Sequence, residues 1–190
     1  AGALLSSRGY AELPPGAIDW AAEGVSIEAL SEGIKRLGNA GFPPVFIFLF
    51  DEAWLLCAAV SRQLRALMGA EAELDEACFA WALRSPTATM THTQPAEPPA
   101  ASYIGSNFGK PHRDSSYAAS HTASGDPTEL SVWVPLNRVT TTNGCMLVVP
   151  SNQDPLFARP ADLMHMQPQL AMPWAHVRAL PCEAGSVLMW

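Results

Sequence analysis

One imidazole and one carboxylate stand two residues apart near the middle of this chain, at His112 and Asp114. Pro111 precedes them and keeps the segment extended. In an extended backbone, side chains at i and i+2 point to the same side, so both can converge on one point while Arg113 points away. Together with one more His, such a pair makes the facial triad that binds non-haem Fe(II). The spacing alone is more often a surface turn with a solvated His.

Three short β-rich runs bounded by Gly, Pro or Asn follow downstream, at residues 130–137, 142–151 and 184–190. The first two are joined by a turn-forming stretch of Thr, Asn and Gly, which is typical of neighbouring strands. Asn143 and Gly144 are assigned to that turn rather than to chemistry. This pattern alone predicts a mixed α and β protein with a mainly antiparallel sheet.

Taken in order, these pieces resemble the phytanoyl-CoA dioxygenase family, whose members use Fe(II) and 2-oxoglutarate. The family pattern is His-x-Asp, a strand with Trp-x-Pro-Leu, Asn-Gly-Cys/Ala-Leu/Met before a strand ending in Pro, and Ala-Gly-Ser/Asp-Val-Leu. The chain has the same order in His112-x-Asp114, Trp133-Val134-Pro135-Leu136, Asn143-Gly144-Cys145-Met146 and Ala184-Gly185-Ser186-Val187-Leu188. The resemblance covers about residues 43–190, and it is specific as a set although no single motif is.

The resemblance implies a mainly β fold with N-terminal helices, built around a double-stranded β-helix, the jelly roll of cupins. We expect a single domain over residues 1–190, with an N-terminal helical part at 1–72 and the jelly-roll core at 73–190. The implied activity is that of a non-haem iron, 2-oxoglutarate-dependent dioxygenase. It would use O2 to hydroxylate a small-molecule or acyl-type substrate and release succinate and CO2. The alternative is a non-catalytic or degenerate jelly-roll binding module that lacks the distal His and the cosubstrate Arg.

The site residues that the resemblance implies begin with His112 and Asp114 as metal ligands. Tyr117 and Trp133 match aromatic residues that lie beside the cosubstrate in family members, although strand aromatics are usually part of a core. Lys110 is a candidate for attracting the anionic cosubstrate, and the alternative is a solvated lysine. We expect no catalytic residue beyond the metal ligands.

The third metal ligand is expected outside the given sequence. In the family, the distal His follows the Gly-Ser/Asp-Val-Leu strand and the Arg that pairs with the keto acid comes further on, whereas this sequence stops at Trp190. We therefore expect a core that is incomplete at its C-terminal end, with both residues beyond Trp190. His165 and His176 are far enough downstream to fold back, and His176 is kept as the weaker alternative ligand. His92 and His121 are expected to be solvated loop histidines.

Two helices are predicted in the N-terminal part. Ser26 is a candidate N-cap for the first, and Asp51 begins a longer second helix that ends at Gly69 and carries Trp54 in its apolar stripe. Residues 45–50 read as a buried strand or as the approach to this second helix. Residues 74–83 resemble the strand that enters the catalytic core.

Composition limits the class of partner. The 190 residues are 48% hydrophobic and 15% charged, which is typical of a globular protein. A net charge of −7 with scattered Lys and Arg argues against nucleic acid and against a polybasic membrane contact. No signal peptide is visible, and the four cysteines lack C-x-x-C spacing, so we expect reduced thiols in an intracellular, cytoplasmic protein with a small-molecule substrate. Substrate identity and oligomeric state do not follow from the sequence.

Overall fold

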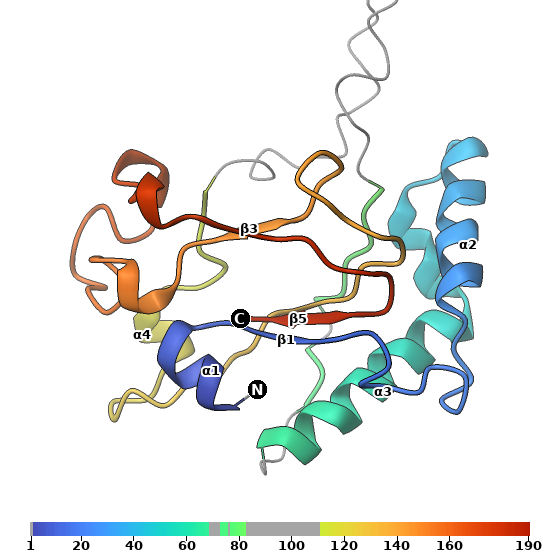
Figure 1. The fold of residues 1–190 in the computed structure, drawn as a ribbon, viewed down its shortest axis with the longest axis horizontal. Coiled ribbons are helices and arrows are strands. Elements are labelled where there is room, and N and C mark those ends of the chain that lie inside the picture. Colours follow the sequence, from blue (N-terminus) through green and yellow to red (C-terminus); the bar gives the residue numbers. More distant parts are fainter. Residues whose placement is uncertain (1, 69–72, 76, 83–110) are drawn as a thin grey trace, which may run out of the picture.

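The computed structural model describes residues 2–68, 73–75, 77–82 and 111–190 (Figure 1). The expected roles of His92 and Lys110 therefore lie outside the described residues. The helices are α1 (Gly2–Arg8), α2 (Ile27–Asn39), α3 (Asp51–Met68) and α4 (Tyr117–Ser120), and the strands are β1 (Ala11–Leu13), β2 (Val132–Trp133), β3 (Met146–Val148), β4 (Arg178–Leu180) and β5 (Val187–Met189). Short 3₁₀ helices are η1 (Pro44–Leu49), η3 (Ser151–Gln153), η4 (Pro168–Leu170) and η5 (Trp174–His176).

Helix α2 begins where its sequence predicts. The Ser26 hydroxyl accepts a hydrogen bond from the backbone N–H of Ala29 over 3.1 Å, which satisfies one of the N–H groups that the first turn leaves open. Leu30 and Ile34, one turn apart on the same face, are both buried. They pack in a cluster whose other buried members are Val25, Ile47 and Ala53. The predicted helix and its cap are confirmed.

The segment before α3 forms the 3₁₀ helix η1, so the prediction of a buried strand over residues 45–50 is wrong. Pro44 stands in the first turn of η1, where its fixed φ suits a helix and its missing N–H costs nothing. In η1 only Pro44 and Ile47 are buried, and Leu49 is 79% exposed. The alternative prediction, that this segment is the approach to the next helix, is confirmed, because α3 begins two residues after η1 ends.

Two further expectations about this half of the chain are wrong. Trp54 is 45% exposed instead of buried, because the buried face of α3 is formed by Ala53, Val60 and Leu64 and Trp54 lies to one side of it. Its indole N–H donates to the Phe48 carbonyl over 2.7 Å, and its ring lies 5.3 Å from the Phe48 ring. No strand forms over 73–75 or 77–82, the described part of the predicted entry strand. Ala80 and Ala82 instead pack against the cluster around Leu30.

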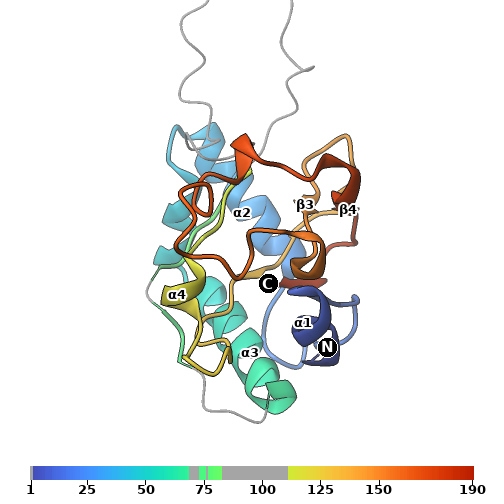
Figure 2. The same ribbon diagram turned by 90° about the vertical axis from the view of Figure 1, so that its left-hand side faces the viewer.

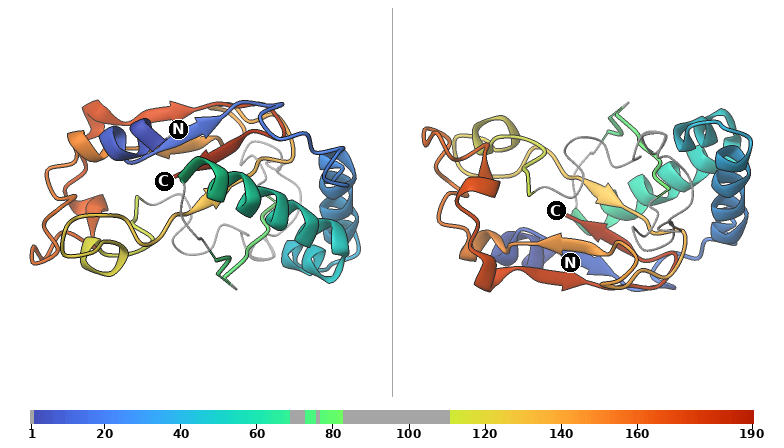
Figure 3. Two further views of the ribbon diagram at one scale, coloured as in Figure 1. Left: turned by 90° about the horizontal axis from the view of Figure 1, so that it is seen from below. Right: turned by 90° about the horizontal axis from the view of Figure 1, so that it is seen from above.

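A three-stranded antiparallel sheet in the order β1-β5-β2 lies at the centre of the fold. In its register Leu13 stands opposite Val187, and Trp133 stands opposite Leu188. Alternation along β5 sends Val187 and Met189 to one side and Leu188 to the other. The first side packs against α3, which crosses that face of the sheet (Figure 3). Strand β1 comes from the expected N-terminal part, so the sheet joins the two parts of the chain.

A second antiparallel pair, β3 and β4, covers the other side of β5. Met146 stands opposite Leu180, and both pack on a cluster formed by Val139, Cys182 and Leu188. The described residues thus place helices on the outside of short antiparallel sheets, an arrangement consistent with a cupin-like fold. The complete jelly roll stays a prediction.

The two ends of the molecule differ in content. Helix α4 and the excursion at residues 151–176 lie at one end, and α2 lies at the other (Figure 1). Seen from the α4 end, the excursion passes beside α4 (Figure 2). Within the described ranges, no helix is long and apolar enough to cross a bilayer.

Candidate metal site

His112 and Asp114 lie on one side of their segment, as their spacing predicts. The Nε2 atom of His112 is 3.4 Å from Oδ1 of Asp114, and the side chains are 46% and 44% exposed. In an octahedral site with metal–ligand distances of about 2.1 Å, adjacent ligand atoms lie about 3 Å apart. The two atoms are therefore close to the separation at which they can share one cation.

The second oxygen of Asp114 is held by two donors. The Ser131 hydroxyl donates to Oδ2 over 2.6 Å, and the Trp190 indole N–H donates to the same atom over 2.9 Å. The backbones of Ser131 and Trp190 exchange two hydrogen bonds of 2.8 and 3.0 Å, which extends the β2–β5 ladder by one pair. Residues directly opposite in an antiparallel pair project to the same face. The sheet end therefore fixes the orientation of the Asp114 carboxylate.

Arg113 points away from the pair, as alternation along an extended segment requires. Its Nη2 atom lies 2.5 Å from Oδ2 of Asp154, and its Nε–H donates to the carbonyl oxygen of His165 over 2.8 Å. Both side chains of the ion pair are largely buried, with 14% and 12% exposed. A low-dielectric setting strengthens such a charge-assisted bond.

His165 is the most buried titratable side chain near the site, with 1% of its surface exposed. The backbone N–H of Tyr117 donates to its Nε2 over 3.0 Å, and its Nδ1 lies 2.9 Å from the carbonyl oxygen of Leu156. A carbonyl can only accept and an amide N–H can only donate, so the geometry assigns the ring proton to Nδ1. Because both nitrogens are engaged, His165 serves the structure and does not ligate a metal here.

The two aromatic residues of the predicted cosubstrate site have different neighbours. Tyr117 stacks on His121 with 4.0 Å between ring centroids and meets the edge of Phe157 at 5.3 Å. His121 is therefore half-buried against a ring rather than solvated. Trp133 packs with the Leu188 cluster between the sheets.

No third ligand joins the pair within the described part of the chain. Groups of three or more His, Cys, Asp or Glu able to hold a metal ion are absent among those residues. His176, the weaker alternative, ends η5 without completing the site. The expected third ligand beyond Trp190 remains a prediction.

A profile of the family described as phytanoyl-CoA dioxygenase (PhyH) matches residues 55–190. This match covers more than half of the sequence. The chain belongs to the phytanoyl-CoA dioxygenase family. The family comprises Fe(II)- and 2-oxoglutarate-dependent oxygenases. No curated protein and no solved structure matches the chain.

The donor set fits part of the metal site that this family implies. An imidazole nitrogen and a carboxylate oxygen are two of the three ligands of a facial triad, and here they face each other at the surface. The described residues of this phytanoyl-CoA dioxygenase family member therefore bring together an imidazole and a carboxylate of the kind that such a triad uses, and the groups that orient the carboxylate.

Sequence reasoning missed the residues that hold the pair. Ser131, Asp154, His165 and Trp190 make polar contacts that span 17 to 76 residues in the chain. Long-range polar contacts leave no periodic signal. The one available hint is Arg113, because alternation places this charged side chain on the opposite side from His112 and Asp114, where the structure shows its partner Asp154.

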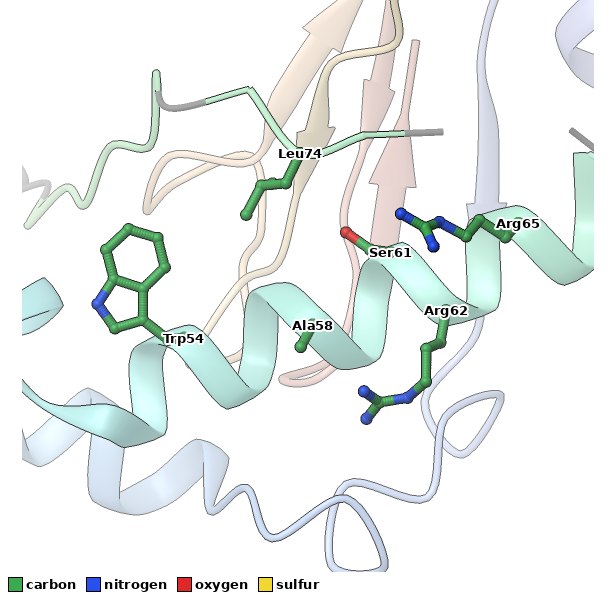
Figure 4. Close-up of a pocket in the computed structure, with 6 residues that line it drawn as sticks. All are labelled: Trp54, Ala58, Ser61, Arg62, Arg65 and Leu74. Atoms are coloured by element: carbon green, nitrogen blue, oxygen red, sulfur yellow. The ribbon is translucent and has the colours of Figure 1, made fainter. Parts of the chain in front are cut away.

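A separate pocket of about 380 Å³ opens along α3. Figure 4 shows Leu74 across from the helix, with side chains of α3 along the rest of the wall; the lining residues are Trp54, Ala58, Ser61, Arg62, Arg65 and Leu74. Arg62 is paired with Glu23. None of these residues is His112 or Asp114, and none is a residue described above as holding them in place.

All four cysteines carry free thiols. Burial, followed by the charge of the neighbouring Cys78, raises the pKa of Cys57 to about 12. Burial, followed by the charge of Glu12, raises the pKa of Cys182 to about 11. Both thiols are therefore poor nucleophiles near neutral pH, since the thiolate is the reactive form.

Proposed function

We propose that this chain is an Fe(II)- and 2-oxoglutarate-dependent dioxygenase that uses O2 to hydroxylate a small-molecule or acyl-type substrate and releases succinate and CO2. Family membership supports the reaction class and favours an enzyme over the non-catalytic jelly-roll module. The observation that carries the proposal for this chain is the His112 and Asp114 pair, with Nε2 and Oδ1 3.4 Å apart.

His112 and Asp114 would hold the metal through Nε2 and Oδ1. The hydrogen bonds from Ser131 and Trp190 occupy Oδ2, so they aim Oδ1 towards the imidazole. When bound, iron together with 2-oxoglutarate and O2 supplies the oxidising chemistry of the hydroxylation. Because nearly half of each ligand side chain is exposed, a substrate can approach the pair from solvent.

The remaining site assignments belong to the same proposal. We propose that the third ligand is a residue outside those described, following β5 as in the family pattern, together with the Arg that pairs with the keto acid. Trp133 and Tyr117 are proposed neighbours of the cosubstrate. Lys110, outside the described residues, is proposed to attract its negative charge.

The test is succinate formation by the natural full-length protein, supplied with Fe(II), 2-oxoglutarate, ascorbate and a panel of small-molecule and acyl-type substrates. We expect His112→Ala and Asp114→Ala to lower turnover by more than the roughly 100-fold typical of losing a group that only supports a ligand. His176→Ala serves as the control and should retain activity.

Three results would count against parts of this proposal. Turnover that survives both ligand substitutions removes the metal from this segment. Loss of activity and of metal binding in His176→Ala makes His176 the third ligand. Absence of any 2-oxoglutarate turnover across the panel, with metal bound normally, favours the binding module.

A further inference from the structure

Arg113, the residue between the two proposed ligands, is largely buried and hydrogen-bonded, whereas the side chains of His112 and Asp114 are nearly half exposed. Arg113 donates two hydrogen bonds to the excursion at residues 151–176, one to the Asp154 carboxylate and one to the His165 carbonyl. A planar guanidinium that binds through two nitrogens fixes direction as well as distance. The peptide planes on either side of Arg113 carry His112 and Asp114, so holding Arg113 limits rotation of both.

His165 makes a second attachment on the far side of Asp114. Its Nε2 accepts the backbone N–H of Tyr117, and its Nδ1 is held 2.9 Å from the Leu156 carbonyl. The Asp154 carboxylate also accepts the Leu156 backbone N–H over 2.9 Å, which ties the start of the excursion to itself. The segment from Arg113 to Tyr117 is thus bound at both ends to one internally braced loop.

These contacts differ from surface polar pairs elsewhere in the molecule. The Arg138 and Glu183 pair spans 3.1 Å, but its side chains are 72% and 56% exposed. Exposed ion pairs contribute little, because water competes for both partners. The Arg113 and Asp154 pair is largely dehydrated, and His165 is almost completely enclosed. Such a buried network holds its members in one arrangement.

We propose that Arg113, Asp154 and His165 form a positioning unit that sets the mutual orientation of His112 and Asp114 before a metal binds. This inference rests on the proposed function, since it assigns these residues a task at the metal pair. They are positioning residues, because they touch the ligand-bearing backbone and no reacting atom.

The experiment titrates the natural full-length protein with Co(II), a spectroscopic stand-in for Fe(II), and records both affinity and the visible absorption spectrum. We expect Arg113→Ala and His165→Phe to weaken Co(II) binding by about 10- to 100-fold and to alter the spectrum. Arg138→Ala, which removes an exposed arginine from an ion pair outside the site, is the matched control and should leave both unchanged.

Conservative variants separate positioning from general stability. His165→Gln keeps an acceptor near the Tyr117 N–H but loses the bond to Leu156, so its affinity should fall between those of the wild type and His165→Phe. Arg113→Lys keeps the charge beside Asp154 but has one nitrogen in place of the two that reach Asp154 and His165, so it should also be intermediate. If Arg113→Ala or His165→Phe fails to fold, these two variants decide the question in the same titration.

A readout without metal completes the design. In the metal-free protein, backbone amides at residues 112–117 should exchange hydrogen faster in the variants, while those of α2 keep the wild-type rate. The inference is overturned if all folded variants bind Co(II) within twofold of the wild-type affinity and show the wild-type spectrum, even if their melting temperature falls.

The proposed function fails in a distinguishable way. If the wild type takes up no Co(II), or if His112→Ala binds it as tightly as the wild type, the metal pair itself is wrong and the positioning unit falls with it. If His112→Ala abolishes binding while Arg113→Ala and His165→Phe do not affect it, only the further inference is wrong.

Discussion

The α2 end and the α4 end of this molecule are held together by different forces. Around α2, apolar side chains that include Leu30 and Ile34 pack in one hydrophobic cluster. Beside α4, the contacts are hydrogen bonds and an ion pair that involve Arg113, Asp154 and His165. Apolar packing is non-directional, whereas hydrogen bonds fix angles. The comparison indicates that the first end supplies stability and the second supplies orientation.

The largest effect on stability is expected in the apolar cluster. Leu30 is 4% exposed, so Leu30→Ala leaves a cavity and should lower the free energy of unfolding by about 2–5 kcal/mol. Urea denaturation measures it, and Co(II) affinity of the folded variant should be unchanged. Leu49→Ala, at a site 79% exposed, is the matched control and should stay within about 0.5 kcal/mol of the wild type. Equal effects of the two substitutions would contradict the division between the ends.

An intermediate effect, on function more than on stability, is expected at the sheet end of the site. Ser131→Ala removes one of two donors to Asp114, so turnover and metal affinity should fall by about 10- to 100-fold. The free energy of unfolding should fall by only about 1 kcal/mol. Ser124→Ala is a close control, because Ser124 also donates to an Asp carboxylate over 2.6 Å but in an exposed turn. Unchanged kinetics in Ser131→Ala would show that Asp114 needs no orientation from the strand.

The smallest expected effect is on the free energy of unfolding at alkaline pH, and no effect is expected near neutral pH. The pKa of Cys57 in the folded chain, about 12, lies above its ordinary 9.0, so the unfolded chain loses this proton first as pH rises. The free energy of unfolding should therefore be unaffected by Cys57 below about pH 9 and should decrease as pH rises from there towards 12. Urea denaturation of the wild type and Cys57→Ala at about pH 8 and about pH 10.5 isolates this contribution. A stability difference between the two proteins that is identical at both pH values would disprove it.

Local signals in the sequence predicted the local features of the fold. The hydroxyl at Ser26 and the apolar spacing after it predicted α2, and the i, i+2 rule predicted that His112 and Asp114 meet while Arg113 turns away. Residues 45–50 show where this reasoning ends. A short apolar run can be a strand or a helix, and Pro44 together with the adjoining α3 decided for the helix. Trp54 likewise fits an apolar stripe by spacing, but the buried face of α3 is centred on Ala53, Val60 and Leu64, and Trp54 lies beside it at the surface.

The residues that hold the candidate site in place could not be predicted from local sequence patterns. His165 stands among Met, Leu and Pro residues in a stretch with no periodicity, and only the folded chain shows both of its nitrogens engaged. Ser131 was visible as part of a strand, but its role depends on Trp190 standing opposite it. Contacts of this kind depend on the path of the whole chain, which short-range patterns do not encode.

The carboxylate of Asp114 draws its partners from distant stretches of sequence, and this has a consequence for folding. Ser131 and Trp190 meet only when β2 and β5 pair, and β5 also pairs with β1 near the start of the chain. Closing loops of this length costs conformational entropy before any contact repays it, and folds rich in such contacts form slowly. The oriented metal pair is thus a product of global closure, assembled with the central sheet and not before it.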